Sequence, residues 1–340
     1  MSILITGGAG FIGSHLVARL LEATEESLIC FDNYQGAAGQ HNLRTLPADP
    51  RLTWIKGDIR DASRLNRVFE HYKIKRVIHL AALAGVRESS RRPRDYYDTN
   101  VRGTHELLQA CQQHRLKRFV FVSSSTVYGL HAPLPFDEDR LGEVPTSPYG
   151  VTKRAAELMV LQQHHLAGLP AVILRPFSVY GPRMRGDLAL ALFCEKMERG
   201  EPLSLFGDGT ACRDYTHVSE ICEGMLAALY RDGVAGQAIN LGGGRPITLS
   251  NVIHRLENAL GVSARVEQLP RQEVDLPATH ASLQRAEALL GYQPSVTFEQ
   301  GLGDYVDWFR NRRFPRLAAS GSDPSQSGPS WTDDRQSRAS

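Results

Sequence analysis

Tyr149 and Lys153 are the residues of this sequence best suited, by type and spacing, to proton transfer. A phenol is a poor base at neutral pH, since its unperturbed pKa is about 10, but a lysine ammonium one helical turn away favours the phenolate. Tyr149 can then serve as a general base toward an alcohol. Ser124 can hydrogen-bond the same substrate oxygen, and Lys153 can also reach hydroxyls of a cofactor. Together the three residues predict a site that takes the proton of a sugar-like alcohol while a hydride leaves the same carbon.

A glycine-rich loop near the amino terminus gives this pattern its context, because Tyr-x-x-x-Lys alone occurs by chance on many surface helices. The apolar run Ile3–Thr6 is typical of a strand, Gly7-Gly-Ala-Gly10-Phe-Ile-Gly13 follows at once, and Ser14–Leu21 has the pattern of a helix. Such a loop lets the backbone approach a pyrophosphate at a helix N-terminus, where free N–H groups favour anions. The next apolar run ends in Asp32, where a carboxylate accepts ribose hydroxyls. No arginine follows Asp32 directly, so NAD is favoured over NADP.

The bulk composition excludes several classes of partner. The chain has 340 residues and a net charge of +2, from 39 basic and 37 acidic residues. Because these charges are interspersed, the sequence has no block of basic residues suited to nucleic acid or to a membrane surface. Its five cysteines are widely spaced and show no metal-ligand spacing, so we expect no metal site and reduced thiols in a cytoplasmic protein. No signal sequence or long apolar span is evident, so neither secretion nor membrane insertion is expected.

Strand and helix patterns alternate along the first half of the chain, which predicts an α/β fold with a doubly wound parallel (Rossmann-type) sheet. The serine cluster Ser123–Thr126 lies at the C-terminal end of a predicted strand, where ligands bind in open α/β sheets. Pro148 would open the helix that carries Tyr149 and Lys153. After Asp32 the predicted strands are 52–58, 76–82, 118–124 and 171–177, and the predicted helices are Asp61–Tyr72, Pro93–His114 and one starting at Pro148.

Three segments are predicted from these patterns. Residues 1–179 would form the NAD-binding domain, and residues 180–314 would form mainly a smaller C-terminal α/β substrate lobe that is interlocked with it and returns strands to the sheet. Residues 315–340 are small, polar and punctuated by proline, so they cannot bury enough apolar surface to offset the cost of ordering. We expect this tail to be disordered.

The ordered set of motifs resembles the extended short-chain dehydrogenase/reductase family, and within it the nucleotide-sugar epimerase branch. The similarity runs from Ile3 to about Arg310, which makes chance similarity negligible. The motifs that carry it are Thr6–Gly13, Gly57-Asp58, His79–Ala82, Asn100–Thr104, Ser123–Gly129, Tyr149 with Lys153, and Arg175-Pro176.

The resemblance implies roles for individual residues. Tyr149, Lys153 and Ser124 would be the catalytic set, and Arg213, in Arg213-Asp-Tyr215, would contact a nucleotide diphosphate, to which a planar guanidinium is well suited. Asp275 belongs to a late Asp-x-Pro element that would also contact the substrate. Without the resemblance, a surface ion pair of Arg213 with Asp208 or Asp214 would be the favoured interpretation. The cofactor-binding residues would be Gly7, Gly10, Phe11, Ile12, Gly13, Asp32, Asn33, Asp58, Ile59, Ala81, Ala82, Asn100, Tyr149, Lys153 and Pro176.

Several reactions of this family begin in the same way, with Tyr149 taking the proton of a C4 hydroxyl while the C4 hydride passes to NAD+. Dehydratases have an Asp-Glu pair where this chain has Ser125-Thr126, and uronate decarboxylases usually have a glutamate in place of Thr126. Epimerisation needs no further acid or base, because the 4-keto intermediate can turn over within the site and take the hydride back on its other face. The sequence therefore favours a 4-epimerase whose NAD stays tightly bound and is not consumed.

Two stretches indicate the sugar. The segment Gly181–Asp187 and the segment Ala84–Arg87 both resemble those of UDP-glucuronate 4-epimerases. Ser125, Thr126, Ser178 and Arg185 would hold the C6 carboxylate without leaving a buried charge unpaired, and Arg87 would lie in the same substrate site. A firm grip would also suppress loss of CO2 from the 4-keto intermediate, which is a β-keto acid. Alternatively, Arg185 only forms a salt bridge with Asp187 on a loop.

Other functions remain open at this stage. The enzyme could epimerise neutral UDP-glucose or UDP-N-acetylglucosamine, or decarboxylate UDP-glucuronate, and a thymidine diphosphate sugar is also compatible with the sequence. A non-catalytic redox sensor is a different class, but sensors of that kind tend to lose the tyrosine or the lysine. By analogy with the family we expect a homodimer that packs through the helices Pro93–His114 and Pro148–Ala167.

Overall fold

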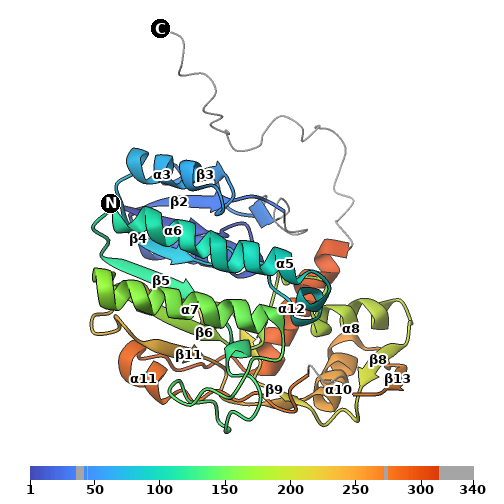
Figure 1. The fold of residues 1–340 in the computed structure, drawn as a ribbon. Helices are drawn as coiled ribbons and strands as arrows, with labels where there is room; N and C mark the ends of the chain where they lie inside the picture. Colours follow the sequence, from blue (N-terminus) through green and yellow to red (C-terminus); the bar gives the residue numbers. More distant parts are fainter. Residues whose placement is uncertain (36–41, 44, 272–274, 314–340) are drawn as a thin grey trace, which may run out of the picture.

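A seven-stranded parallel sheet forms the centre of the computed structural model, which describes residues 1–35, 42–43, 45–271 and 275–313 (Figure 1). The strand order is β11-β6-β5-β4-β1-β2-β3, and every pairing is parallel. The doubly wound parallel sheet predicted from the sequence is therefore confirmed. The strands are β1 (Ser2–Thr6), β2 (Ser27–Asp32), β3 (Leu52–Lys56), β4 (Ile74–His79), β5 (Arg118–Val122), β6 (Ala171–Pro176) and β11 (Ala238–Leu241).

Helices cover both faces of this sheet, which explains why β1, β5 and β6 are buried along their whole length. Successive side chains of a strand point to opposite faces, so Leu4 packs in one hydrophobic cluster while Ile3 and Ile5 pack in the other. Helices α3, α6 and α7 contribute to the first cluster and α1 and α9 to the second. Their bounds are α1 (Phe11–Ala23), α3 (Ala62–His71), α6 (Gly103–Gln112), α7 (Pro148–Ala167) and α9 (Val218–Tyr230).

The C-terminal part of the chain is joined to the main sheet through β11, which pairs with β6. The division into a domain of residues 1–179 and an interlocked lobe of residues 180–314 stays a prediction. The expected disordered tail, residues 315–340, lies outside the described residues.

The remaining elements are α4 (Val86–Arg91), α5 (Pro93–Tyr96), η1 (Tyr97–Arg102), η2 (Ser125–Val127), β7 (Val179–Tyr180), α8 (Ala189–Glu198), β8 (Leu203–Phe206), β9 (Cys212–Arg213), β10 (Thr216–His217), β12 (Ile247–Thr248), α10 (Leu249–Leu260), β13 (Val266–Leu269), α11 (Gln284–Leu290) and α12 (Phe298–Arg313).

One predicted helix is interrupted. Instead of a continuous α-helix over 93–114, the structure has α5, the π-helical turn η1 and then α6. Asn100 lies in η1, and its side chain accepts from the Leu83 N–H and donates to the Leu83 carbonyl and to Thr152 Oγ1. These buried hydrogen bonds to distant parts of the chain favour the π turn over a regular helix.

A buried ion pair fixes helix α7 to strand β6. The Arg175 guanidinium donates to both carboxylate oxygens of Glu157, at 2.9 and 2.8 Å, and each side chain is only 4% exposed. Arg175 also donates to Tyr128 Oη and to the Glu138 carbonyl. Helix α7 carries Tyr149 and Lys153, so this pair helps to position the residues expected to do chemistry.

We predict that Glu157→Ala destabilises the protein strongly, because it leaves the Arg175 charge buried without its partner. Loss of one member of a buried pair costs about 3–5 kcal/mol of unfolding free energy. Glu195→Ala is the control: it breaks an exposed ion pair with Arg199 and should cost at most about 1 kcal/mol. Urea unfolding measures both, and equal losses in the two variants would contradict the prediction.

Candidate active site

Helix α7 begins directly before Tyr149. Its N-cap is Ser147, whose Oγ accepts from the Gly150 N–H at 3.2 Å, and Pro148 occupies the first turn, where no N–H is needed. Tyr149 and Lys153, four residues apart, therefore lie on one face of the helix. The structure brings this face against the end of strand β5 and the loop that follows it.

The Tyr149 phenol lies among three groups from different parts of the chain. The phenol forms a hydrogen bond with Ser124, and the positive charge of Arg185 acts on it. The centroids of the Tyr149 and Tyr96 rings are 6.2 Å apart, in an edge-to-face arrangement. Burial raises the pKa of Tyr149, and the hydrogen bond and the arginine charge offset that rise only in part. The expected pair of Tyr149 and Ser124 is thus in contact.

The Lys153 ammonium is turned toward strand β5. Its buried ammonium donates to the Val122 carbonyl at 2.8 Å and lies 4.9 Å from the centre of the Phe121 ring. Burial lowers the pKa of Lys153 to about 8, against an opposing effect of Glu157. The charge that lowers the pKa of Tyr149 in this structure comes from Arg185, because the Lys153 ammonium is turned toward the backbone of β5.

The serine cluster forms a tight turn at the C-terminal end of β5. Ser124 caps the short 3₁₀ turn η2, and its Oγ accepts from the Thr126 N–H at 3.2 Å and from the Thr126 hydroxyl at 3.1 Å. Ser125 is the first residue of this turn. Ser178 lies between β6 and β7, the next strands of the chain, and its carbonyl accepts from the Thr216 N–H.

Arg185 approaches the phenol from the loop after β7. Its guanidinium forms a two-point ion pair with Asp187, at 2.9 and 2.7 Å, while its side chain remains 32% exposed. A methyl group built on Gly85 would lie 3.4 Å from both Arg185 Nη2 and Tyr96 Oη. These are ordinary contact distances, so it is the φ of +126° at Gly85 that favours glycine beside these two residues.

The glycine loop has the geometry of an anion-binding helix N-terminus. A methyl group at Gly13 would lie 2.2 Å from the Gly7 carbonyl oxygen, and Gly7 has φ +77°, so both positions require glycine. The N-cap Gly10 has no side chain to bind the first N–H groups of α1, and the first turn contains no acidic residue. The N–H groups at Phe11 and Ile12 are thus available to a phosphate.

Two carboxylates flank this loop on the side of β2 and β3. Asp32 accepts from the N–H groups of Ala9 and Tyr34, at 3.0 and 2.8 Å, and burial raises its pKa. Asp58 accepts from Asn33 Nδ2 and from the Arg60 guanidinium, and that arginine holds the pKa of Asp58 well below its usual range. The residues predicted to hold the adenosine half of NAD are therefore close together.

The other predicted cofactor residues differ in what they can contact. The Asn100 amide already has protein partners for its oxygen and for both hydrogens, which limits it to positioning the Leu83 backbone. Ala81 and Ala82 follow β4, Ile59 is buried near Gly103, and Pro176 ends β6. All four positions are at or near the C-terminal edge of the sheet, where a dinucleotide is expected.

Among the predicted substrate residues, Arg87 and Asp275 are brought together and Arg213 lies elsewhere. Arg87 Nη2 is 3.2 Å from Asp275 Oδ2, and its guanidinium stacks 4.6 Å above the Phe206 ring. Arg213 lies on β9 and donates to the Cys212 carbonyl. None of its contacts with the described residues reaches the Tyr149 group.

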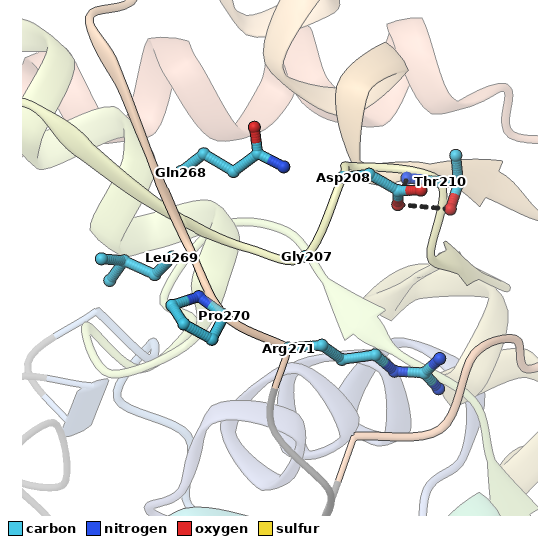
Figure 2. A pocket seen from close by; sticks show the side chains of 7 residues that line it. All are labelled: Gly207, Asp208, Thr210, Gln268, Leu269, Pro270 and Arg271. Carbon is cyan, nitrogen blue, oxygen red and sulfur yellow. Dashed lines mark hydrogen bonds between the residues drawn. The ribbon is translucent and has the colours of Figure 1, made fainter.

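A hollow of about 630 Å³ lies between the turn that follows β8 and the end of β13 (Figure 2). The sequence patterns did not single out Arg271, whose guanidinium donates to the Asp275 carbonyl at 3.3 Å. They did not single out Phe206 either, since an aromatic residue at a strand end resembles core packing. The lining residues are Gly207, Asp208, Thr210, Gln268, Leu269, Pro270 and Arg271.

The sequence also predicted that the protein has no metal site and no membrane-spanning segment. Within the described ranges, no group of three His, Cys, Asp or Glu side chains could hold a metal ion. In the same part of the chain, no helix is long and apolar enough to cross a membrane.

Comparisons with known proteins give the same assignment as these motifs. Residues 3–242 match the NAD dependent epimerase/dehydratase family. A UDP-glucuronate 4-epimerase of Thermodesulfobacterium geofontis is 37% identical over 310 residues, which cover 90% of this chain and 95% of that protein.

Two solved structures are similar over 92% of this chain and all of their own chains. UDP-glucuronic acid 4-epimerase from Bacillus cereus, in complex with UDP-glucuronic acid and NAD, has 36% identity and a TM-score of 0.87. UDP-glucose 4-epimerase from Thermotoga maritima, with UDP-glucose, has 31% identity and a TM-score of 0.86. This chain belongs to the NAD-dependent epimerase/dehydratase family.

Proposed function

We propose that this protein is an NAD-dependent 4-epimerase that converts UDP-glucuronate to UDP-galacturonate through a transient 4-keto sugar. The observation that carries the proposal is the meeting of Tyr149, Ser124 and Arg185 at the C-terminal edge of the sheet. A proton acceptor, a hydroxyl and a cation suited to a carboxylate are thereby combined in one place. The relatives named UDP-glucuronate 4-epimerase support the same reaction.

In the proposed reaction, Tyr149 takes the proton of the C4 hydroxyl and later returns one to the C4 oxygen. Ser124 already hydrogen-bonds the phenol, so it can hold the substrate oxygen beside it. Bound NAD+ supplies the hydride acceptor and, once reduced, the hydride donor. Lys153 holds the end of β5 through the Val122 carbonyl.

Recognition of a uronate would rest on Arg185 with the hydroxyls of Ser125, Thr126 and Ser178. A guanidinium binds a carboxylate through two parallel hydrogen bonds, which fixes the orientation of the group as well as its position. Such a grip would keep the C6 carboxylate out of line with the C4 carbonyl and would suppress decarboxylation. It would also discriminate against a neutral C6 hydroxymethyl group.

A neutral-sugar 4-epimerase is the second candidate, and one contact favours it. Asp187 already accepts from Nε and Nη2 of Arg185, as expected if the arginine only stabilises its own loop. The similarity to a UDP-glucose 4-epimerase agrees with this alternative.

The test is incubation of the purified protein with UDP-glucuronate and no added NAD, followed by proton NMR of the anomeric and H4 signals. Formation of UDP-galacturonate is expected and would show that NAD was retained during purification. A UDP-pentose would instead identify a decarboxylase. No change with UDP-glucuronate, but turnover of UDP-glucose, would assign the protein to the neutral-sugar epimerases.

We predict that Arg185→Gln lowers kcat/KM for UDP-glucuronate roughly 10- to 100-fold, because hydrogen bonds to a charged group are each worth about 1.5–3 kcal/mol. The pH dependence of kcat should also move to higher pH. The sign follows from the Arg185 charge, which lowers the pKa of Tyr149; without it, the phenol needs a higher pH to lose its proton.

Steady-state kinetics across pH check both effects. Arg91→Gln is the control, since Arg91 is an exposed arginine on α4 whose side chain is 80% exposed. An Arg185→Gln enzyme with unchanged kcat/KM and an unchanged pH profile would argue that this arginine is only structural.

We further propose a homodimer that packs through α6 and α7. Helix α7 exposes a row of large apolar side chains that a monomer would leave in water, namely Val151, Leu158 and Leu166, the last two 63% and 78% exposed. Tyr97, on η1 beside α7, is 45% exposed. Light scattering after gel filtration should give twice the mass of one chain, and Leu158→Glu should reduce it to that of a monomer.

A cytoplasmic location completes the proposal. All five cysteines are free thiols in the structure, and four of them are buried. Cysteines that stay as free thiols are typical of proteins in a reducing compartment. Cell fractionation with an antibody to the protein would check it, and recovery from a secreted fraction would contradict it.

A further inference from the structure

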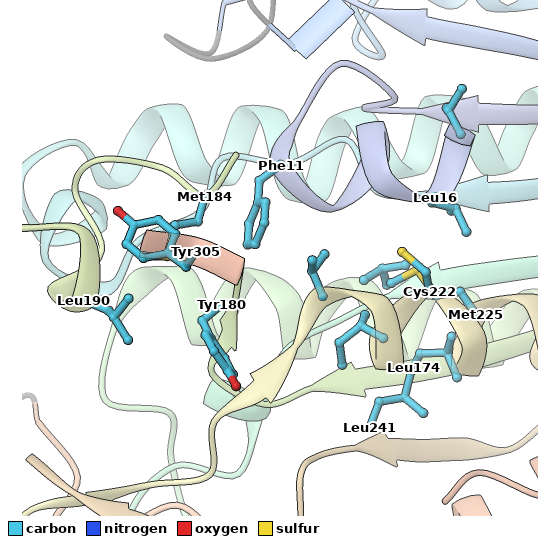
Figure 3. Close-up of a cluster of buried hydrophobic side chains, with 14 of the residues drawn as sticks. Phe11, Leu16, Leu174, Tyr180, Met184, Leu190, Cys222, Met225, Leu241 and Tyr305 are labelled. Carbon is cyan, nitrogen blue, oxygen red and sulfur yellow. The ribbon is translucent and has the colours of Figure 1, made fainter. Parts of the chain in front are cut away.

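Arg183 stands out in the loop between β7 and α8. Its φ of +65° is one of three positive values among the described non-glycine residues, and such a conformation is unfavourable for a residue with a side chain. The next residue, Met184, is buried and faces the Phe11 ring at the start of α1 (Figure 3). The unusual backbone at Arg183 therefore occurs where this loop packs on the glycine-loop helix.

The Arg183 guanidinium is connected to the glycine loop by consecutive hydrogen bonds. Its Nη1 donates to Thr45 Oγ1 at 3.1 Å, and Thr45 Oγ1 donates to the Asn42 carbonyl at 2.7 Å. Asn42 Nδ2 in turn donates to the carbonyl of Ala9, inside the glycine loop, at 3.1 Å. The arginine thus reaches from the loop after β7 across to the segment that borders the expected cofactor.

The second contact of Arg183, with His15, leaves the Arg183 Nε–H without an acceptor. Arg183 Nε lies 3.2 Å from His15 Nε2, but that same nitrogen lies only 2.7 Å from the Pro182 carbonyl oxygen. A nitrogen that donates to the carbonyl must carry a hydrogen, so it cannot accept from Arg183 as well. Burial lowers the pKa of His15 to about 4, so the ring is neutral and has a single N–H for this purpose.

The charge of Arg183 is also uncompensated within the described part of the chain. The half-buried side chain has no Asp or Glu oxygen of a described residue within 4.0 Å, and burial lowers its pKa. Other partly buried arginines, such as Arg60 and Arg76, have carboxylate partners. A half-buried guanidinium with spare donors and only neutral contacts is suited to an external anion.

We propose that Arg183 contacts the pyrophosphate of the bound dinucleotide and slows its release. The N–H groups at the start of α1 would hold the phosphates from one side, and Arg183 would close over them from the loop after β7. This inference rests on the proposed function, because it requires NAD to remain in the enzyme between turnovers.

The position of Arg183 favours the dinucleotide over the sugar nucleotide as the source of the phosphates. His15, on α1, lies next to Arg183, and Thr45 is linked to Ala9 of the glycine loop. Two of the residues expected to contact the sugar nucleotide, Arg87 and Asp275, are paired beside Phe206 instead.

The experiment measures NAD kept by the enzyme as purified. Wild type, Arg183→Ala, Arg183→Lys and Thr45→Val are passed through gel filtration at low and high salt, and total NAD per chain is determined after acid or base release. Release is then timed by dilution into a trap that consumes free NAD. Arg19→Ala is the control, because it removes an α1 arginine that pairs with Glu223 instead.

Arg183→Ala should release NAD roughly 10- to 100-fold faster than wild type, and Arg183→Lys should restore part of the difference because it keeps a positive charge. Thr45→Val should have a smaller effect, since the charge remains. KM for the UDP-sugar should stay near the wild-type value. Thermal unfolding of each NAD-saturated variant verifies that it is folded.

Three results would overturn the inference. The first is a release rate of Arg183→Ala equal to that of wild type. The second is a Thr45→Val variant as fast as Arg183→Ala with no rescue by lysine, which would mean that the arginine only anchors its loop. The third is a large rise in KM for the UDP-sugar with normal NAD release, which would move the contact to the substrate diphosphate. A wild-type protein that retains no NAD would instead contradict the proposed function itself.

Discussion

A buried hydrogen bond from the Lys153 ammonium to the Val122 carbonyl determines how helix α7 lies against the end of strand β5. Val122 is the last residue of β5, and Ser124 follows two residues later, so the same bond sets the approach of Ser124 to Tyr149. The Arg175–Glu157 ion pair adds a second connection, one turn further along α7. Proton-transfer geometry thus depends on contacts made deep in the sheet, where side chains have little freedom.

Most of the fold could be predicted from local sequence signals. A strand buried on both faces is a continuous apolar run, and a glycine loop between such a run and a helix has few alternative structures. The strand ending at Asp32, the strand predicted over 118–124 (observed as Arg118–Val122) and the helix opening at Pro148 followed from these signals. Placing Ser124 beside Tyr149 also needed only the rule that ligands bind at the C-terminal edge of parallel strands.

What the sequence did not predict depends on contacts between distant segments. The π turn at η1 is stabilised by hydrogen bonds from Asn100 to Leu83 and Thr152, 17 and 52 residues away. The effect of Arg185 on the Tyr149 phenol joins residues 36 positions apart, on a loop and a helix that no local pattern places together. Helical spacing suggested Lys153 as the charge that acts on the phenol, but spacing does not reveal the carbonyl acceptor toward which the ammonium is turned.

The pair of Arg185 and Asp187 also bears on how a uronate would be accommodated. Asp187 is 60% exposed, and exposed ion pairs are worth at most about 1 kcal/mol, so a substrate carboxylate can replace it at little cost. That carboxylate would neutralise the arginine charge that lowers the pKa of Tyr149. In a uronate epimerase, binding the substrate would therefore withdraw the electrostatic support that Arg185 gives to the Tyr149 phenolate, so the protonation of the phenol would depend on whether a substrate carboxylate occupies the arginine.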